Sequence, residues 1–384
     1  MSRLRLANLT SIAIADHLEQ SSRIIIERNQ IVGAGLSSMG NDVVNFYGTA
    51  TEMLWFSHNK QWRQFGADHE MMTLDGGGGM YWGPVALSGR TATLARETNP
   101  RDYSPKMLHD FSGAWFGVLS GAGAGQFARV AANTNTSIEL DRDLEHPLDD
   151  TSMVSVVPYR GNLFFVANEY EDGGPFQLYG MSQECIVAEN TGARMDGFSG
   201  SGLNPHGWGW QPNWFNIFAD NQILEGNALG GKSARFAAGG SYDDLDHKFG
   251  IPSQDNYSGN LSGPLNVGVV FRRNHAKSNA RFSIDGSTEC ALLERNRVEK
   301  APVGIHVTNR TAGVFLVGNE FEDVHQHFCW DTPAMHGPAC YHPPRMAPPG
   351  DAGASDEAVD PLTGVRLPAW RRRAAWSPPE PADK

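Results

Sequence analysis

The sequence lacks any long stretch of helical periodicity. Its apolar residues fall in short runs that are rich in β-branched and aromatic side chains, a pattern typical of strands. A doubly wound α/β protein is excluded, because no helical segments alternate with these runs. A leucine-rich repeat is excluded as well, because the chain has no regular leucine framework. An all-β protein is the remaining fold class.

An excess of positive charge is also missing. The 384 residues include 31 Lys and Arg against 43 Asp and Glu, which gives a formal net charge of −12. This balance argues against nucleic acid and anionic membrane as partners, although a local basic groove could still hold an anionic glycan. No apolar run approaches the roughly 18 residues of a membrane span. The N-terminus has no proper signal peptide, because its apolar stretch is short and contains Asp16 and His17.

What the sequence does contain is a repeat that ends in asparagine. Steps of 22 residues separate Asn168 from Asn190 and Asn274 from Asn296. A period of this size is typical of a solenoid, in which each coil buries its apolar side against its neighbours. Asparagine tolerates a left-handed corner and can form hydrogen-bonded ladders at strand spacing. We therefore expect one ladder along an edge of the solenoid, made of the asparagines that close eight apolar runs: Asn29, Asn59, Asn168, Asn190, Asn221, Asn274, Asn296 and Asn319.

This repeat resembles the right-handed parallel β-helix of the pectate lyase and polygalacturonase superfamily, over roughly Ile24 to Val324. The resemblance implies a right-handed parallel β-helix solenoid with inserted loops over 1–331. A Pro-rich, partly disordered tail is expected over 332–384, which holds 11 of the 22 prolines. Between Asn59 and Asn168 the ladder is interrupted, and we expect several coils there with a different corner residue.

The first residues already have the sequence pattern of a coil, and no capping segment is visible before them. An open first coil would expose unpaired strand edges. We therefore expect that the chain lacks upstream coils or a cap, and that the full-length protein is secreted or exposed at the cell surface.

The four cysteines allow two interpretations near the end of the solenoid. Six potential metal ligands lie within 18 residues, at His325, His327, Cys329, His336, Cys340 and His342. Their spacing matches no standard zinc motif, and a Cys329–Cys340 disulfide that staples a C-terminal cap is the alternative. We predict no metal site and no cofactor. Cys185 and Cys290 lie on asparagine strands and are expected to be small buried hydrophobic residues.

A glycan-binding groove is predicted where loops interrupt the coils, because inserted loops carry the function of a solenoid. Three tryptophans lie within seven residues of a Gly- and Pro-rich loop. Exposed rings of this kind stack on sugar faces; alternatively, the loop folds back and the rings cover the side of the solenoid. The predicted substrate-binding residues are His69, Trp115, Arg129, Arg194, His206, Trp208, Trp210 and Trp214.

Acidic residues near these loops suggest catalysis. Two carboxylates that flank a glycosidic bond suffice for hydrolysis, whereas a lyase needs a base and a cation that neutralises a uronate. The predicted catalytic residues are Glu70, Asp75, Glu169, Asp172 and Asp196. Because the signature motifs of polygalacturonases and pectate lyases are missing, no catalytic residue carries over from them and pectin is not implied. The sequence predicts a carbohydrate-active protein with a polysaccharide or oligosaccharide partner, a glycoside hydrolase ahead of a lyase. The alternative is a non-catalytic, adhesive or glycan-binding β-helix.

Overall fold

A computed structural model of the chain describes residues 5–7, 14–16, 20–32, 44–46, 50–63, 70–74, 79–95, 97, 110–203, 210–227, 233–241, 265–286, 288–308 and 311–330. The chain divides into two compact units, Met1–Cys340 and Tyr341–Lys384. The tail predicted over 332–384 lies outside the described residues, and its boundary at 331 stays a prediction. Among the described residues there is no helix that could cross a membrane.

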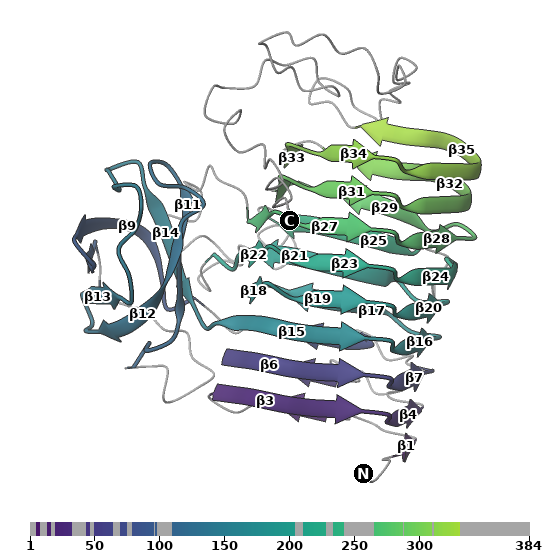
Figure 1. Ribbon diagram of the computed structural model, residues 1–384, viewed down its shortest axis with the longest axis horizontal. Helices are drawn as coiled ribbons and strands as arrows, with labels where there is room; N and C mark the ends of the chain where they lie inside the picture. Colours follow the sequence, from purple (N-terminus) through teal and green to yellow (C-terminus); the bar gives the residue numbers. More distant parts are fainter. Residues whose placement is uncertain are drawn as a thin grey trace, which may run out of the picture. The chain divides into compact units, whose positions relative to one another are not determined.

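Three rows of parallel strands stack coil upon coil (Figure 1). The first row carries the long apolar runs and contains β3 (Gln20–Glu27), β6 (Ala50–Ser57), β15 (Arg160–Val166), β19 (Ile186–Ala188), β23 (Ile217–Ala219), β27 (Val270–Arg272), β31 (Leu292–Glu294) and β34 (Phe315–Val317). Short strands extend this row: β18 (Ser182–Gln183), β22 (Asn213–Trp214), β26 (Asn266–Val267), β30 (Thr288–Glu289) and β33 (Thr311–Ala312).

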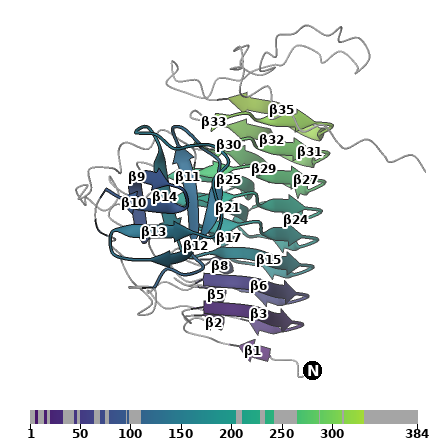
Figure 2. The same cartoon turned by 60° about the vertical axis from the view of Figure 1, so that its left-hand side comes forward.

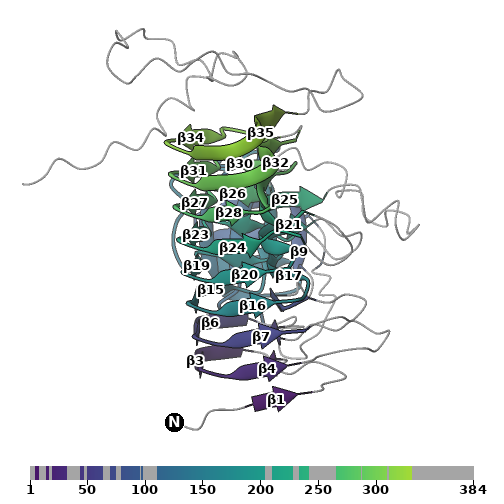
Figure 3. The same ribbon diagram turned by 90° about the vertical axis from the view of Figure 1, so that its right-hand side faces the viewer.

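The second row follows the asparagine corner, and Figure 3 shows it stacked between the other two. It contains β1 (Arg5–Ala7), β4 (Gln30–Val32), β7 (Lys60–Trp62), β16 (Glu169–Glu171), β20 (Thr191–Ala193), β24 (Gln222–Glu225), β28 (His275–Lys277), β32 (Arg297–Val307) and β35 (Glu320–Trp330). The third row contains β2 (Ile14–Asp16), β5 (Val44–Phe46), β8 (Met72–Leu74), β17 (Pro175–Tyr179), β21 (Gly197–Leu203), β25 (Arg235–Ser241) and β29 (Arg281–Ile284). Because parallel crossovers coil in the right-handed sense, the fold is the predicted right-handed parallel β-helix.

The asparagine ladder is confirmed and is continuous. Each amide oxygen along it accepts bonds from the backbone N–H and the Nδ2 of the asparagine one coil earlier, as Asn190 does from Asn168 at 2.9 Å for both. Each Nδ2 from Asn59 onward also donates to a backbone carbonyl, as Asn190 does to Phe165 at 2.9 Å. The step of 109 residues from Asn59 to Asn168 does not interrupt it, because Asn59 bonds directly to Asn168. The ladder therefore marks consecutive coils at all eight positions.

The left-handed corner residue is not the asparagine, as the sequence had suggested, but the residue before it. Arg295 has a φ of 52°, for example, and none of the eight ladder asparagines has a positive φ. The asparagine side chain is thereby turned inward to bond along the stack, while the left-handed backbone turns the chain. The residues before the eight asparagines have φ between 52° and 61°: Arg28, His58, Ala167, Glu189, Asp220, Arg273, Arg295 and Gly318.

Replacing Asn296 with leucine is expected to lower the free energy of unfolding by about 3–4 kcal/mol. Leucine would remove four hydrogen bonds: those from the backbone N–H and Nδ2 of Asn274 to the Asn296 amide oxygen, and those from the Asn296 Nδ2 to the Phe271 carbonyl and the Asn319 amide oxygen. A buried polar group without a partner costs about 1–3 kcal/mol. Asn29→Leu is the matched control, because Asn29 makes one side-chain bond, to Asn59; it should cost about 1 kcal/mol. Equal losses in urea unfolding would contradict this account.

Aromatic side chains fill the interior of the coils. Phe236 stacks between Phe198 and Phe282 at centroid distances of 5.6 and 5.0 Å, one ring from each coil of the third row. All three side chains are fully buried. Two kinds of side chain therefore stack from coil to coil: the asparagines at the corner and the aromatic rings in the core.

The region between Asn59 and Asn168 departs from the prediction. Its described residues form no further coils; after β8 they form a closed antiparallel barrel in the order β10-β13-β12-β11-β14-β9 (Figure 2). The reason is that its strands lack the asparagine corner and pair as hairpins with one another, around a core of their own that includes Phe116, Val130 and Val154. The barrel strands are β9 (Tyr81–Ser88), β10 (Thr91–Leu94), β11 (Trp115–Ser120), β12 (Phe127–Asn133), β13 (Ser137–Leu140) and β14 (Met153–Val157).

A second apolar core joins the barrel to the solenoid. It combines Trp82 and Trp115 of the barrel with Met181, Trp214 and Leu265 of the solenoid. Trp115 and Trp214 meet edge to face, with ring centroids 5.0 Å apart. We call this contact region the joint. Because large aromatic side chains bury much area, they fix the barrel against the coils.

Candidate functional site

The predicted tryptophan platform is not exposed. Trp115, Trp210 and Trp214 are each at most 1% exposed, so of the two rings expected to be partly exposed, Trp208 or Trp210, Trp210 is not. The described ends of the loop lie close together, since Leu203 and Gln211 form an antiparallel bridge, and the Ser155 hydroxyl donates to the Trp210 carbonyl at 2.5 Å. These rings support the joint from inside and cannot stack on a sugar at the surface. His69, Asp75, His206 and Trp208 lie outside the described residues.

One of the predicted acids, Asp172, belongs with Arg194 to an ion-pair network at the corner between the second and third rows. The Arg194 guanidinium binds Asp172 at 2.5 Å, and Glu171 and Glu225 at 3.0 Å each. The hydrogen bonds that Arg194 donates to Asp172, and then to Glu225 and Glu171, raise the pKa of Arg194 further above its ordinary value. Glu169 is paired with Lys60 at 2.8 Å. These ion pairs link neighbouring coils, and each of these side chains already has a charged partner.

Glu70 and Asp196 are brought together on the third row. Glu70 accepts a hydrogen bond from the Gln177 amide. Met72 of β8 pairs with Phe176, and Gly197 of β21 pairs with Pro175. Extending this register places Glu70 and Asp196 on either side of the coil between them, two strand spacings or roughly 9–10 Å apart at the backbone. They remain a candidate pair of acids.

A second constellation lies at the joint, around Arg129 of β12. The Arg129 guanidinium stacks 3.4 Å from the ring centroid of Tyr159, and its Nη2 lies 3.5 Å from Oε2 of Glu52. Burial lowers the pKa of Arg129. Its Nη1 is buried and has no hydrogen-bond partner among the described residues. A donor in this state has capacity for a further acceptor.

Tyr159 connects the barrel to β15 and organises the other side of this constellation. Its hydroxyl donates to Oε2 of Glu184 at 3.2 Å and accepts from Nδ2 of Asn162 at 3.3 Å. Burial, together with the nearby Glu184 carboxylate, raises the pKa of Tyr159, so the phenol stays protonated and remains a donor. Gly161 makes this arrangement possible, because a Cβ at that position would overlap the Tyr159 ring.

The strand register of the first row sets the distance between Glu52 and Glu184. Glu52 of β6 pairs with Gly161 of β15, and Gly161 pairs with Gln183 of β18, which precedes Glu184. The two carboxylates therefore rise from coils two strand spacings apart, roughly 9–10 Å at the backbone. Tyr159 and Asn162 come from the coil between them. Both glutamates reach solvent, with the Glu52 side chain 39% exposed.

An exposed aromatic pair continues this surface along the strands. Trp55 is 40% exposed, and its ring centroid lies 5.8 Å from that of Phe164 on the next coil. Leu54 and Phe56 on either side of Trp55 are fully buried, so Trp55 points outward. It follows Glu52 by three residues, roughly 10 Å along β6. The sequence contained this signal, since strict alternation in a strand places the middle residue of Leu54-Trp55-Phe56 outside, but the tryptophan-rich loop drew attention instead.

We call Glu52, Arg129, Tyr159, Asn162 and Glu184 the joint site, and Trp55 with Phe164 its aromatic extension. Of the predicted residues, only Arg129 belongs to the joint site. It combines two carboxylates, a phenol, a guanidinium with unused donor capacity and an amide. Such a set can bind hydroxyl groups and can place an acid and a base on opposite sides of one bond.

Comparison with solved structures finds phage tailspikes. The tailspike of Pseudomonas phage phi297 is 9% identical, with 78% of this chain and 67% of that one covered and a TM-score of 0.22. The tailspike of Pseudomonas phage LKA1 is 9% identical, with 81% and 70% covered and a TM-score of 0.21. The tailspike of Acinetobacter baumannii bacteriophage AP22, in complex with a capsular saccharide of A. baumannii, is 9% identical, with 77% and 64% covered and a TM-score of 0.19.

No family model and no curated protein match the sequence. Scores this low carry no weight for function, and the fold rests on the strand pairing of this chain itself.

Proposed function

We propose that the protein binds a polysaccharide across the joint site and its aromatic extension, and that it hydrolyses the bound chain. The observation that carries this proposal is the placing of Arg129 and Tyr159 between two glutamates on coils two spacings apart. A glycan is the ligand that fits, because hydroxyl groups pair with carboxylates and amides while sugar faces stack on exposed rings. The proposed ligand is of the same class as the capsular saccharide bound by the Acinetobacter phage tailspike.

Glu52 and Glu184 are the proposed acid and base. Carboxyl groups about 6.5–9.5 Å apart suit an inverting mechanism, in which one protonates the leaving oxygen and the other activates water. The flexible side chains of two glutamates that start roughly 9–10 Å apart can reach this separation. Asn162 and the Tyr159 hydroxyl lie between the two acids, where they can hold the hydroxyls of the sugar at the scissile bond. A glycan of this kind agrees with the extracellular location that the sequence predicts, which we retain as part of the proposal.

Binding without cleavage is the second candidate. The observation that favours it is that each carboxylate already has a partner, Glu52 in Arg129 and Glu184 in Tyr159. A panel of polysaccharides separates the two, with reducing ends read for hydrolysis and unsaturated-sugar absorbance for a lyase reaction. New reducing ends support hydrolysis. Retention of a glycan in affinity electrophoresis without any product supports the binding module, and absorbance near 235 nm would identify a lyase.

Trp55→Ala should weaken binding of the polysaccharide selected from this panel about 10- to 100-fold, since stacking of a ring is worth about 1–3 kcal/mol. Isothermal titration measures the change. Trp62→Ala is the matched control, because Trp62 lies on the second row beside Lys60 and outside the joint site; its affinity should stay within about twofold. If Trp55→Ala bound as tightly as the wild type, the glycan would not lie on the aromatic extension.

A further inference from the structure

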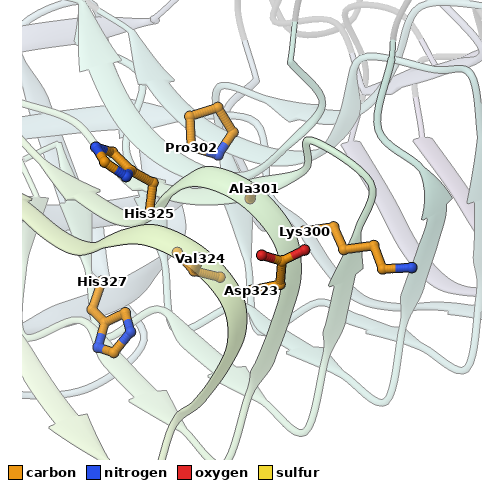
Figure 4. A pocket seen from close by; sticks show the side chains of 7 residues that line it. All are labelled: Lys300, Ala301, Pro302, Asp323, Val324, His325 and His327. Carbon is orange, nitrogen blue, oxygen red and sulfur yellow. The ribbon is translucent and has the colours of Figure 1, made fainter.

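A pocket of about 480 Å³ lies at the last described coils, away from the joint site. It occupies the corner between the second and third rows, where β32 and β35 run through as continuous strands. Figure 4 shows its polar side chains, with the Asp323 carboxylate near the centre and Lys300 extending away from it. A volume of this size is within the usual range for small-ligand sites. The lining residues are Lys300, Ala301, Pro302, Asp323, Val324, His325 and His327.

Among the described residues, the charged side chains of this pocket are not held in ion pairs as Arg194 is at the same corner. Lower in the stack, the left-handed corner residue Arg194 is held by three carboxylates. Lys300 and Asp323 occupy the equivalent left-handed position, each with a φ of 53°, on adjacent coils. Within the described part of the chain neither Lys300 nor Asp323 forms an ion pair.

The two histidines that line the pocket are both exposed. His327 stacks on Phe321 with a centroid distance of 4.7 Å and an angle of 12° between the rings. In Figure 4 the two imidazoles project to different sides of β35. Each imidazole can donate or accept a hydrogen bond. The pocket therefore offers a carboxylate, an ammonium and two imidazoles around a small apolar floor.

The side chains that line this pocket favour one class of ligand over others. The described residues contain no group of three His, Cys, Asp or Glu side chains that could hold a metal ion. A small anion is disfavoured by the central Asp323 carboxylate. An uncharged ligand with several hydroxyl groups fits, because a carboxylate accepts from hydroxyls while an ammonium and imidazoles donate to them.

We infer that this pocket is a second saccharide site, which takes one or two uncharged sugar residues separately from the joint site. The choice of ligand class rests on the proposed function, whereas the place rests on the pocket itself. Two sites on one rigid solenoid would let a single polysaccharide, or two neighbouring chains, be held at two points. Such linkage raises overall affinity without new contacts at either site.

The test uses the full chain with ¹⁵N-labelled histidine and titration with millimolar glucose, galactose, mannose, rhamnose and N-acetylglucosamine. His325→Gln and His327→Gln assign the two signals. At least one sugar should shift both signals saturably, and Asp323→Asn should weaken that sugar at least tenfold. Asparagine suits the left-handed backbone at this position. Glu322→Gln is the matched control, because Glu322 pairs with Arg297 and does not line the pocket.

Each outcome decides between the two sites. Shifts that survive in Glu52→Gln and Glu184→Gln show a site separate from the joint. If no sugar shifts the histidines while the panel polysaccharide still binds in a Trp55-dependent way, this inference fails and the proposed function stands. If the histidines shift but no panel polysaccharide binds at the joint, the proposed function fails and the corner site stands. A shift with inorganic sulfate and with none of the sugars, or an unchanged affinity in Asp323→Asn, would overturn the saccharide assignment.

Discussion

Glu52→Gln and Glu184→Gln are each expected to lower turnover of the bound polysaccharide about 10²–10⁴-fold, the usual contribution of a general acid or base. An amide keeps the shape of the side chain but cannot exchange the proton, so the dissociation constant should change by no more than about threefold. Single-turnover release of reducing ends measures the chemical step, and isothermal titration with intact polysaccharide measures affinity. The fold should be unaffected, because both side chains lie at the surface of the first row.

Two controls make this result specific. Glu139→Gln changes an exposed barrel glutamate whose neighbour is Arg90, and it should leave turnover unchanged. Glu70→Gln and Asp196→Asn test the rival pair of acids on the third row. Loss of turnover in those two variants and not in the joint variants would move the catalytic centre to the third row. A wild-type protein that binds but releases no product would leave the binding module as the function.

Gly197→Ala is expected to destabilise the solenoid by more than about 5 kcal/mol, which in practice means little or no soluble folded protein. Gly197 has a φ of 111°, a conformation that L side chains rarely adopt. A Cβ there would also overlap the carbonyl oxygen of Arg235 on the next coil. Because the obstacle is backbone held in a parallel pair, no side-chain rotation can relieve it.

Gly89→Ala is the matched control for Gly197→Ala. Gly89 has a φ of 57°, and a Cβ there would meet nothing within 4 Å. Its cost should be about 1–2 kcal/mol, the strain of a left-handed residue alone. Thermal unfolding followed by circular dichroism compares the two variants. Similar melting temperatures would show that the coils can shift apart at Gly197, against the close packing of the third row.

The solenoid could be predicted because its signal is repeated. An asparagine recurs at the same corner of eight coils, and at the six positions between Asn29 and Asn319 its buried amide bonds to the coil before and the coil after. The corner conformation was assigned to the wrong residue because the pattern shows only the chemically distinctive side chain. The residues that carry the positive φ, such as Arg28, Ala167 and Asp220, share no side-chain type.

The barrel could not be predicted by the same reasoning, since it occurs once. Its hairpins have no counterpart elsewhere in the chain, and an interruption of the ladder fits extra coils as well as an inserted unit. The burial of Trp115, Trp210 and Trp214 is likewise decided by tertiary contact between the barrel and the coils. Composition alone does not separate a tryptophan that closes such a contact from one that stacks on a ligand.

The predictions for the cysteines had different outcomes. Cys185 is fully buried, as expected. Cys290 is exposed, because it occupies a left-handed position with a φ of 58° in the bend between β30 and β31. Cys329 is buried. Its predicted partner Cys340 lies outside the described residues, so the disulfide stays a prediction.

The uninterrupted hydrogen bonding from Asn59 to Asn168 has a consequence for how this architecture can change. One coil later, β17 and β18 are joined by only Gly180 and Met181, whereas in the coil below the same junction carries the whole barrel. The corner therefore accepts either a tight turn or an independently packed module without altering the register on either side. Exchange of one module for another at this junction would replace Arg129 while keeping Glu52, Asn162 and Glu184 in place. Under the proposed function, the barrel's contacts with a glycan would then vary independently of the proposed acids Glu52 and Glu184, which keep their places on the coils.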